Sequence, residues 1–204
     1  HPTQLASMVV SETDATCFGF TDGSAEVVGL NATPDYSYSW SNGQTTALAT
    51  GLGAGQYTCT VTDDNGCEVD QIVTVGHPND LVITLSKNDI SCFGDNNGEI
   101  FSIVTGGTQD YTYFWTDENG ISINGNSPSI SNLSPGQYNL QVIDENNCLA
   151  SDSITIIEPT QLTSSIVSET DATCFGFTDG SAEVVGLNAT PDYSYSWSNG
   201  QTTA

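Results

Sequence analysis

The sequence predicts an all-β protein made of tandem immunoglobulin-like or fibronectin-like β-sandwich modules that form a semi-rigid rod. Three features predict this fold: a long internal repeat, short runs in which apolar and polar residues alternate, and cysteines at matching positions of the repeats. Alternation with a period of two is typical of strands that bury one face. Gly, Asn, Ser, Thr and Asp are abundant, and these residues form the turns between short strands.

The internal repeat divides the chain into three modules. Residues 10–47 recur without a change as residues 167–204, and a diverged copy lies between them. An Xaa-Pro pair precedes each copy, and these pairs are His1-Pro2, His77-Pro78 and Glu158-Pro159. We therefore predict modules at residues 1–76, 77–157 and 158–204. The third is only the first half of a module, and we expect the native chain to continue, because half a sandwich exposes its core and a sheet edge.

The linkers between modules predict the stiffness of the rod. The segments around His77-Pro78 and Glu158-Pro159 are too short to be flexible tethers. Proline fixes its own φ and restricts the residue before it, so successive modules are expected to stack with little freedom.

The first module shows the expected strands most clearly. In chain order they are Leu5–Val10, Ser24–Leu30, Tyr36–Trp40, Gln56–Thr62 and Val69–Val75. Ser41-Asn42-Gly43 is a turn signal, and the Gly-x-Tyr start of the Gln56 strand is typical of the tyrosine corner of immunoglobulin-like domains. The second module has about six extra residues within Asp117–Ser131, a segment rich in Asn, Gly and Ser that predicts a longer loop. We expect about seven strands per complete module.

The charge of the chain excludes several partners. There are 25 Asp and Glu residues against one basic residue, Lys87, and the formal net charge is −24. Such a surface repels nucleic acid and anionic lipid, and keeps an exposed protein soluble and unassociated. No apolar run approaches the 18 residues or so that a membrane-spanning helix needs, so we predict no membrane insertion.

The six cysteines predict disulfides and an oxidising compartment. Cys92 and Cys148 of the second module align with Cys17 and Cys67 of the first. We therefore predict the disulfides Cys17–Cys67 and Cys92–Cys148, with Cys174 unpaired because its module is incomplete. Leu140 takes the place of Cys59 in the second module, so Cys59 is interpreted as a buried thiol.

No catalytic constellation is present, and we predict that the chain is not an enzyme and needs no cofactor. His77 occupies a linker position at which Glu158 stands in the next copy, which argues against a catalytic base. No nucleophile elbow, phosphate loop or zinc-ligand pattern occurs. The three tryptophans lie in the repeated aromatic strand, where packing in the core is favoured over stacking on a sugar.

One weak signal for calcium lies in the turn before the last cysteine of each module. Its oxygen-bearing residues are Asp63, Asp64 and Asn65 in the first module and Asp144, Glu145 and Asn146 in the second. Dense oxygen ligands on a tight loop are able to hold Ca²⁺, although neither segment has the spacing of an EF-hand. Asp and Asn also form turns without any metal, and this interpretation is favoured.

The order of motifs in each module resembles the SprB-type repeat. In the first module these motifs are Cys17-Phe18-Gly19, Asp22-Gly23-Ser24, Tyr36-x-Tyr38-x-Trp40, Leu52-x-x-Gly55-Gln56-Tyr57, Val61-x-Asp63 and the closing Cys67. That family occurs in very large cell-surface adhesins of Bacteroidetes, including those of gliding motility. The resemblance implies export by the type IX secretion system and display as a long filament moved by the gliding machinery. The first module has Asn31-Ala32-Thr33 where many family members have Gly-Gly, as the second module does at Gly106-Gly107, and this difference is expected to alter only a loop.

The resemblance also implies a glycosylation candidate. Bacteria of that phylum attach O-linked glycans at Asp-(Ser/Thr)-apolar triplets, and Asp152-Ser153-Ile154 fits this pattern. Ser153 is therefore a candidate, and the alternative is a serine that is simply exposed on a strand.

These observations lead to a hypothesis of function. The chain is interpreted as a fragment of the repetitive shaft of a giant extracellular adhesin filament that mediates attachment and gliding motility. Its expected partners are extracellular surfaces or glycans, the gliding and secretion machinery of the cell envelope, and neighbouring repeats of the same chain. The alternative is a passive stalk of a secreted multidomain enzyme or carbohydrate-binding protein.

Overall fold

The computed structural model describes residues 4–123, 125–190 and 192–204, and the predicted boundary pair His1-Pro2 lies outside these residues. All regular secondary structure of the described residues is β-strand, which confirms the all-β prediction. No helix in this part of the chain has the length and apolar composition that crossing a bilayer requires.

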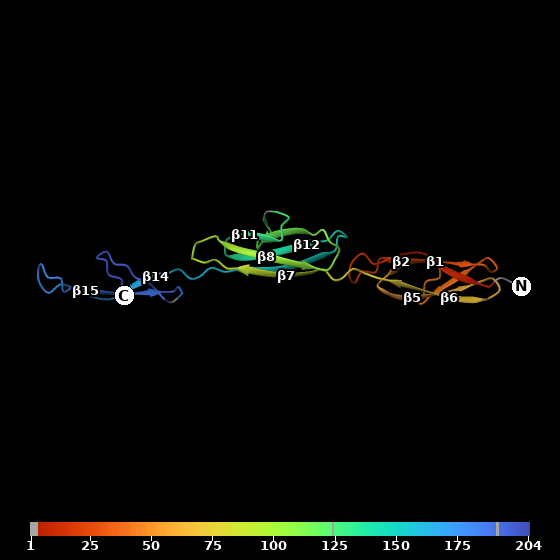
Figure 1. Ribbon diagram of the computed structural model, residues 1–204, viewed down its shortest axis with the longest axis horizontal. Helices are drawn as coiled ribbons and strands as arrows, with labels where there is room; N and C mark the ends of the chain where they lie inside the picture. The colour runs from red at the N-terminus through yellow and green to blue at the C-terminus, as the bar shows by residue number, and fades with distance from the viewer. Residues whose placement is uncertain (1–3, 124, 191) are drawn as a thin grey trace. The chain divides into compact units, whose positions relative to one another are not determined.

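The first repeat is a sandwich of two antiparallel sheets (Figure 1). Its strands are β1 (Ala6–Thr13), β2 (Gly23–Leu30), β3 (Ser37–Trp40), β4 (Leu48–Leu52), β5 (Gly55–Thr62) and β6 (Glu68–Val75). The sheet orders are β1-β2-β4 and β3-β5-β6. An immunoglobulin domain pairs its strands A, B and E in one sheet and C, F and G in the other. The first repeat therefore has the immunoglobulin-like topology, without a D strand.

The core of the first repeat lies between these two sheets. Residues of β2 alternate between buried and half-buried positions, as a pleated strand over a core must. The buried cluster draws on both sheets and comprises Ala25, Val27, Trp40, Ala49, Leu52, Cys59, Val61, Val73 and Val75. Gly23 begins β2 at a close approach of the two sheets, because an added Cβ would lie 2.8 Å from both Leu52 O and Val75 Cγ1. This contact explains the glycine of the Asp-Gly-Ser motif.

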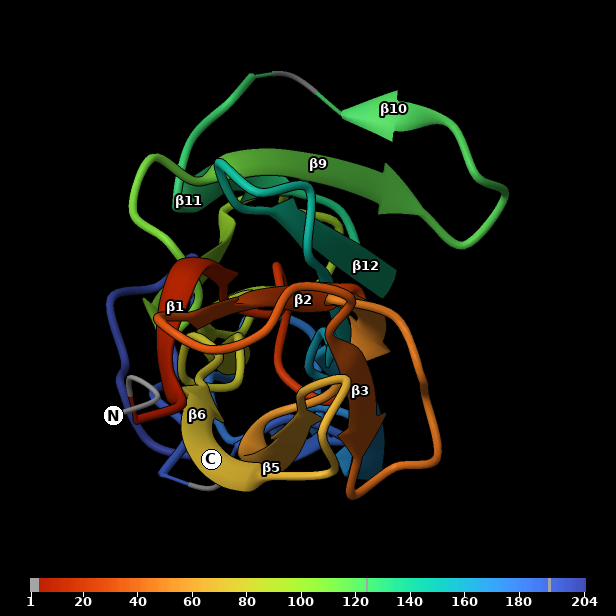
Figure 2. The same cartoon turned by 90° about the vertical axis from the view of Figure 1, so that its right-hand side faces the viewer.

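The second repeat has the same arrangement with one additional strand. Its strands are β7 (Val82–Asn88), β8 (Gly98–Thr105), β9 (Thr112–Asp117), β10 (Ser122–Ile123), β11 (Ser129–Leu133), β12 (Gly136–Ile143) and β13 (Leu149–Ile156). The sheet orders are β7-β8-β11 and β10-β9-β12-β13. The extra residues that predicted a longer loop contain β10, which pairs with β9 at the sheet edge (Figure 2). Variable-type immunoglobulin domains add a strand at this same edge.

The loop after the second strand of each repeat accommodates its sequence difference. Asn31 has φ of 67° and Gly106 has φ of 76°, so both adopt the left-handed conformation that Asn and Gly tolerate. A Cβ at Gly106 would lie 1.8 Å from Asp80 O, so the second repeat requires glycine where the first has asparagine. The loop of the second repeat also contacts the segment before β7, because Gly107 donates its N–H to Asn79 O at 2.8 Å.

The third repeat forms one hairpin. Its strands β14 (Thr163–Thr170) and β15 (Ser181–Leu187) are antiparallel, and Thr163 pairs with Leu187 as Ala6 pairs with Leu30 in the first repeat. Apolar side chains remain exposed on this hairpin, with Ile166 at 65% of its full exposure. The half module thus exposes the surface that a second sheet covers in the complete repeats.

The chain folds into two compact units. One contains the residues up to Thr84 together with Ile103–Phe114 and Gln141–Asp152, and the other contains Leu85–Ser102, Trp115–Leu140 and Ser153–Ala204. The first unit therefore includes the first repeat and the part of the second repeat that surrounds the His77-Pro78 linker.

Candidate functional site: the repeat junction

The AB loop of the first repeat, residues 14–22, lies where the chain leaves that repeat. Ala15, just after β1, donates its N–H to Gly76 O at 3.0 Å, and Gly76 follows β6. The Gly76 N–H in turn donates to Asp14 Oδ1 at 2.6 Å. Strands β1 and β6 therefore end together, and we call this end of the sandwich its downstream end.

Hydrogen bonds within the AB loop hold Cys17 in a defined turn. Phe20 donates its N–H to Cys17 O at 3.1 Å, and Gly19 has φ of 77°, which a residue with a Cβ rarely adopts. Thr16 donates its N–H to Asp22 Oδ1 at 3.0 Å and its hydroxyl to Asp22 Oδ2. The pKa of the exposed Asp22 carboxyl is lowered by these two bonds, and the bond from the Thr16 hydroxyl has the larger effect.

The FG loop, residues 63–67 of the first repeat and 144–148 of the second, lies at the opposite, upstream end. Asp144 is buried at 4% exposure, and its carboxylate accepts the N–H of Cys148 at Oδ1 and the N–H of Thr108 at Oδ2, both at 2.8 Å. Asp63 accepts the N–H of Cys67 in the same way at 2.8 Å. A carboxylate that satisfies backbone N–H groups fixes a turn, so these aspartates orient the cysteine that follows them.

Four of the six residues predicted as calcium ligands make hydrogen bonds in or next to this turn. Asn146 donates its side-chain N–H to Thr16 O at 3.2 Å and to Thr108 Oγ1 at 2.9 Å. Asn65 donates its side-chain N–H to Thr33 Oγ1 at 2.6 Å, whereas Asp64 and Glu145 are exposed. No group of three or more His, Cys, Asp or Glu residues in the described chain is arranged to hold a metal ion. Calcium binding by these loops stays a prediction.

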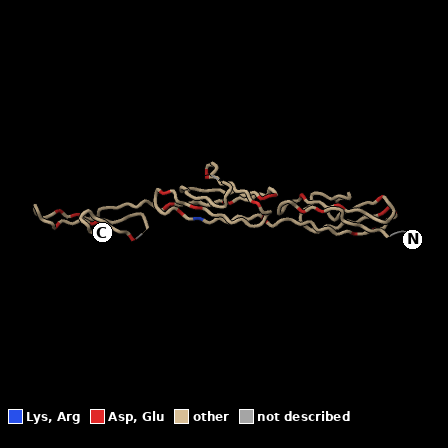
Figure 3. The backbone as a smooth tube through the Cα atoms, turned by 45° about the horizontal axis from the view of Figure 1, so that its top comes forward, with Lys and Arg blue, Asp and Glu red and all other residues tan. Residues whose placement is uncertain are grey.

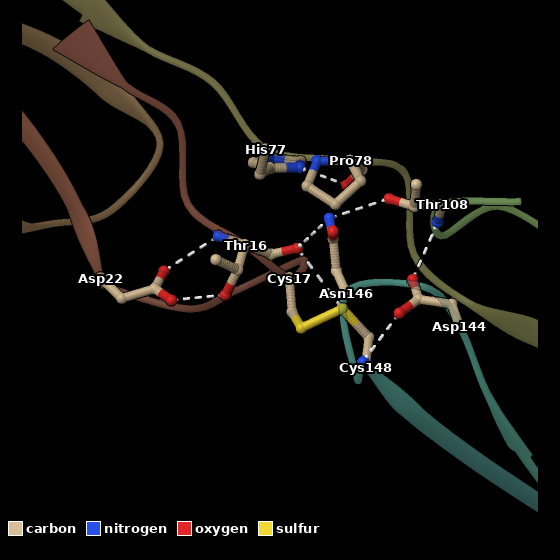
Figure 4. Close-up of a disulfide and its surroundings, with 9 residues drawn as sticks. All are labelled: Thr16, Cys17, Asp22, His77, Pro78, Thr108, Asp144, Asn146 and Cys148. Atoms are coloured by element: carbon tan, nitrogen blue, oxygen red, sulfur yellow. Dashed lines mark hydrogen bonds between the residues drawn. A yellow bond between two sulfur atoms is a disulfide. The ribbon is translucent and has the colours of Figure 1, made fainter.

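A disulfide joins Cys17 of the first repeat to Cys148 of the second (Figure 4). Their Cα atoms are 5.7 Å apart although they are separated by 131 residues in sequence. Both cysteines are buried, and the carbonyl oxygen of Thr16 lies 3.4 Å from Cys148 Sγ. Across the linker, the ring of Phe18 contacts the ring of His77 edge-on at a centroid distance of 4.9 Å. Covalent, hydrogen-bonding and aromatic contacts thus all connect the AB loop to the residues that follow the first repeat.

The predicted pairings Cys17–Cys67 and Cys92–Cys148 are wrong. Within one sandwich the AB loop lies at the downstream end, whereas Cys67 precedes β6 and lies at the upstream end. Strand β6 has 8 residues, so the two ends are about 26 Å apart at about 3.3 Å per residue. A disulfide requires Cα atoms within about 7 Å, so Cys17 and Cys67 of one sandwich are too far apart to bond, and Cys17 bonds to Cys148 of the following repeat instead.

The other four cysteines are free in the part of the chain that the structure describes. Cys59 is fully buried opposite Trp40 in the β3–β5 pair, as the sequence predicted, and burial raises the pKa of its thiol. It stands two residues after the corner Tyr57, the position of the F-strand cysteine of antibody domains. Cys67, Cys92 and Cys174 are exposed.

The structure also places the predicted tyrosine corners, the core tryptophans and the glycosylation candidate Ser153. The Tyr57 hydroxyl donates to Gly53 O at 3.0 Å and the Tyr138 hydroxyl to Ser134 O at 2.9 Å, which confirms the tyrosine corner. Trp40 and Trp115 are buried at 3% and 1% exposure, which confirms their place in the cores. Ser153 is exposed on β13 and accepts a hydrogen bond from Gln137 Nε2 at 3.2 Å. Its glycosylation stays a prediction.

Acidic residues are spread along the backbone (Figure 3). They occur along all three repeats, and the single basic residue, Lys87, pairs with Asp89 at 2.8 Å. The hydrogen bond from Lys87, followed by one from the Ile157 N–H, lowers the pKa of the exposed Asp89 carboxyl.

The fold and the junction define a class of protein: a tandem array of immunoglobulin-like modules, in which the first repeat is bonded covalently to the second. The SprB repeat matches the chain three times, at residues 10–45, 84–120 and 167–202, which together are more than half of its length. The chain belongs to the SprB repeat family. Its repeats are therefore structural modules.

The chain is also similar to several solved structures, but at low sequence identity. No curated protein matches the chain in sequence. A structure solved for Dscam isoform specificity is 12% identical, with a TM-score of 0.34, and the match covers 76% of this chain and 46% of that one. An amphioxus IgVJ-C2 molecule is 15% identical, with a TM-score of 0.33 and coverages of 74% and 95%. A fragment of intimin, solved in complex with the intimin-binding domain of its translocated receptor, is 14% identical, with a TM-score of 0.41 and coverages of 79% and 66%.

Proposed function

We propose that this chain is a segment of the shaft of a giant extracellular adhesin displayed on a Bacteroidetes cell. The observation that most supports this function is the disulfide between Cys17 and Cys148, because it ties one repeat to the next instead of closing a single module. A bond at this position resists both separation and rotation of neighbouring repeats, which is what a load-bearing shaft requires. Disulfides of this kind persist in oxidising environments outside the cell.

The proposed shaft is a positioning element without catalytic activity. Its modules extend a distal region towards extracellular surfaces or glycans, and its neighbouring repeats are its closest partners. The net charge of −24 keeps parallel filaments apart and disfavours nucleic acid and anionic membranes as ligands. Export by the type IX secretion system and movement by the gliding machinery complete the proposal, on the basis of the family to which the repeats belong.

The experiment that tests this function uses antibody fragments raised against the purified chain. Applied to live cells of the source bacterium, these Fab fragments should label the cell surface and reduce attachment to glass, and beads that bear them should be carried along gliding cells. Fab fragments against an unrelated surface protein are the control, and should label without reducing attachment. If the epitope is found only on a secreted polypeptide with a catalytic domain, the repeats are the stalk of an enzyme and the proposed function is wrong.

A further inference from the structure

The second and third AB loops have the same local geometry as the first, although their cysteines are unpaired. Asp95 donates its N–H to Cys92 O at 3.1 Å, as Phe20 does to Cys17 O. Gly94 has φ of 83°, close to the 77° of Gly19. Phe177 makes the same bond to Cys174 O at 3.0 Å. Each AB loop is thus folded into the turn that presents a cysteine at the downstream end.

The connection of the second AB loop to its linker also repeats that of the first. Ile90 donates its N–H to Ile157 O at 3.0 Å, as Ala15 does to Gly76 O. The Ile157 N–H donates to Asp89 Oδ1 at 2.9 Å, as Gly76 does to Asp14. Glu158, at the linker position of His77, accepts the N–H of Gly94 at 3.0 Å. Residues on both sides of Cys92 therefore bond to the linker before the third repeat, as residues near Cys17 bond to the linker before the second, although Cys92 itself is exposed.

The FG loop of the first repeat has the same local geometry as the FG loop of the second. Cys67 O accepts the Asp63 N–H at 3.0 Å and Cys148 O accepts the Asp144 N–H at 3.1 Å, so the two hairpins share their closing bond. Gly66 and Asn147 both have positive φ, at 81° and 65°. The side chain of Asn65 bonds to Thr33 as that of Asn146 bonds to Thr108, and Asn146 also reaches the carbonyl of the preceding AB loop. The first FG loop thus presents the same surface, with Cys67 exposed at its upstream end.

We propose that the AB-loop cysteine of every repeat forms a disulfide with the FG-loop cysteine of the complete repeat that follows it. Cys92 and Cys174 each bond forward, and Cys67 bonds backward, wherever such neighbours exist. Each bond forms when two thiols lose two protons and two electrons, which a disulfide oxidant accepts through thiol–disulfide exchange. This inference goes beyond the proposed function, because it holds whether or not the shaft binds a surface.

The consequence of the proposal is a ladder of overlapping covalent loops. Cys92 lies inside the loop that Cys17–Cys148 closes, so the next bond begins before the previous loop ends. A pulling force on the two ends of an array then follows the disulfides and bypasses most strands of each sandwich. Reduction of a single bond transfers the load to the overlapping loop instead of releasing the whole enclosed segment.

The test completes the third repeat. Residues 167–204 are identical to residues 10–47, so appending a copy of residues 48–76 after Ala204 restores a whole module with an equivalent of Cys67. The extended chain is refolded in a buffer of reduced and oxidised glutathione, alkylated, and digested without reduction by a protease that cleaves at acidic residues. Mass spectrometry should find the Cys92 peptide linked to the peptide of the appended Cys67 equivalent, beside the Cys17–Cys148 pair.

Two matched variants decide the outcome. The extended chain with Cys92→Ser should lose only the new linkage and leave the appended cysteine alkylated. A second chain, with a copy of residues 77–157 placed before residue 1, should link the added equivalent of Cys92 to Cys67. The proposal is overturned if Cys92 or Cys67 is recovered alkylated from these chains while Cys17–Cys148 is intact, or if either cysteine is linked within its own repeat. Both readouts are independent of attachment and gliding.

Discussion

Opening the Cys17–Cys148 disulfide should lengthen the unfolded chain by a large and calculable amount. The bond shields 131 residues from a force applied at the two ends of the chain. At about 3.5 Å per extended residue, this segment is roughly 460 Å long, and the 5.7 Å between the two Cα atoms is negligible beside it. Pulling single molecules with an atomic force microscope or optical tweezers should therefore show a contour length that is greater by roughly 450 Å after reduction, or in the Cys148→Ser variant.

Cys92→Ser is the matched control for this measurement. Cys92 is exposed and has no disulfide partner in the chain, so its substitution should leave the contour length unchanged. Disulfides within the repeats would instead shield two segments of roughly 50 to 60 residues, and Cys92→Ser would then release about 200 Å. That release, together with a smaller effect of Cys148→Ser, would refute the bonding between repeats.

Three further predictions concern single side chains. In the native oxidised chain, a thiol reagent at neutral pH should modify the exposed cysteines and spare Cys59, whose pKa burial raises; equal rates would contradict its position in the core. Tyr57→Phe removes the hydrogen bond to Gly53 O and should lower the free energy of unfolding by about 1 kcal/mol in urea titrations; an unchanged value would show that this bond adds no stability. The pKa of Asp22 is lower in the folded chain than in the unfolded chain, where it is about 4. Its bonds to Thr16 therefore contribute their full stability above about pH 4, and this stability is lost as the pH falls through the folded-state pKa. The melting temperature of Asp22→Asn should therefore lie below that of the wild type at pH 7 and approach it as the pH falls through the folded-state pKa of Asp22, whereas a constant difference would contradict this role.

Much of the fold was predictable from local patterns. The alternation of Tyr36–Trp40 and Gln56–Thr62 located β3 and β5, and the Gly-x-Tyr start of β5 indicated the tyrosine corner. Strand β4 was missed, because Leu48–Leu52 is short and contains Ala, Thr and Gly, with no β-branched apolar residue. Its strand conformation depends on pairing with β2, a contact between distant residues.

The site was only half predictable, because alignment identifies equivalent cysteines but not their partners. Cys17 and Cys67 recur together in sequence, which favoured a bond within the repeat. The missing information was the direction of the strands: β1 and β6 run the same way, because Ala15 after β1 bonds to Gly76 after β6. A cysteine after the first strand and a cysteine before the last then lie at opposite ends of a sandwich. The bonded neighbour is the next repeat, which no pattern within one repeat specifies.

The disulfide between the first and second repeats is tested most directly by a single tryptic cut. Lys87 is the only Lys or Arg, so trypsin cleaves the denatured, alkylated and unreduced chain once, between Lys87 and Asn88. This cut places Cys17 and Cys148 on different fragments. The two fragments should stay joined on a non-reducing gel and in the intact mass until reductant is added, and they should separate at once in the Cys148→Ser variant. Fragments of the wild-type chain that separate before reduction would contradict the presence of this disulfide.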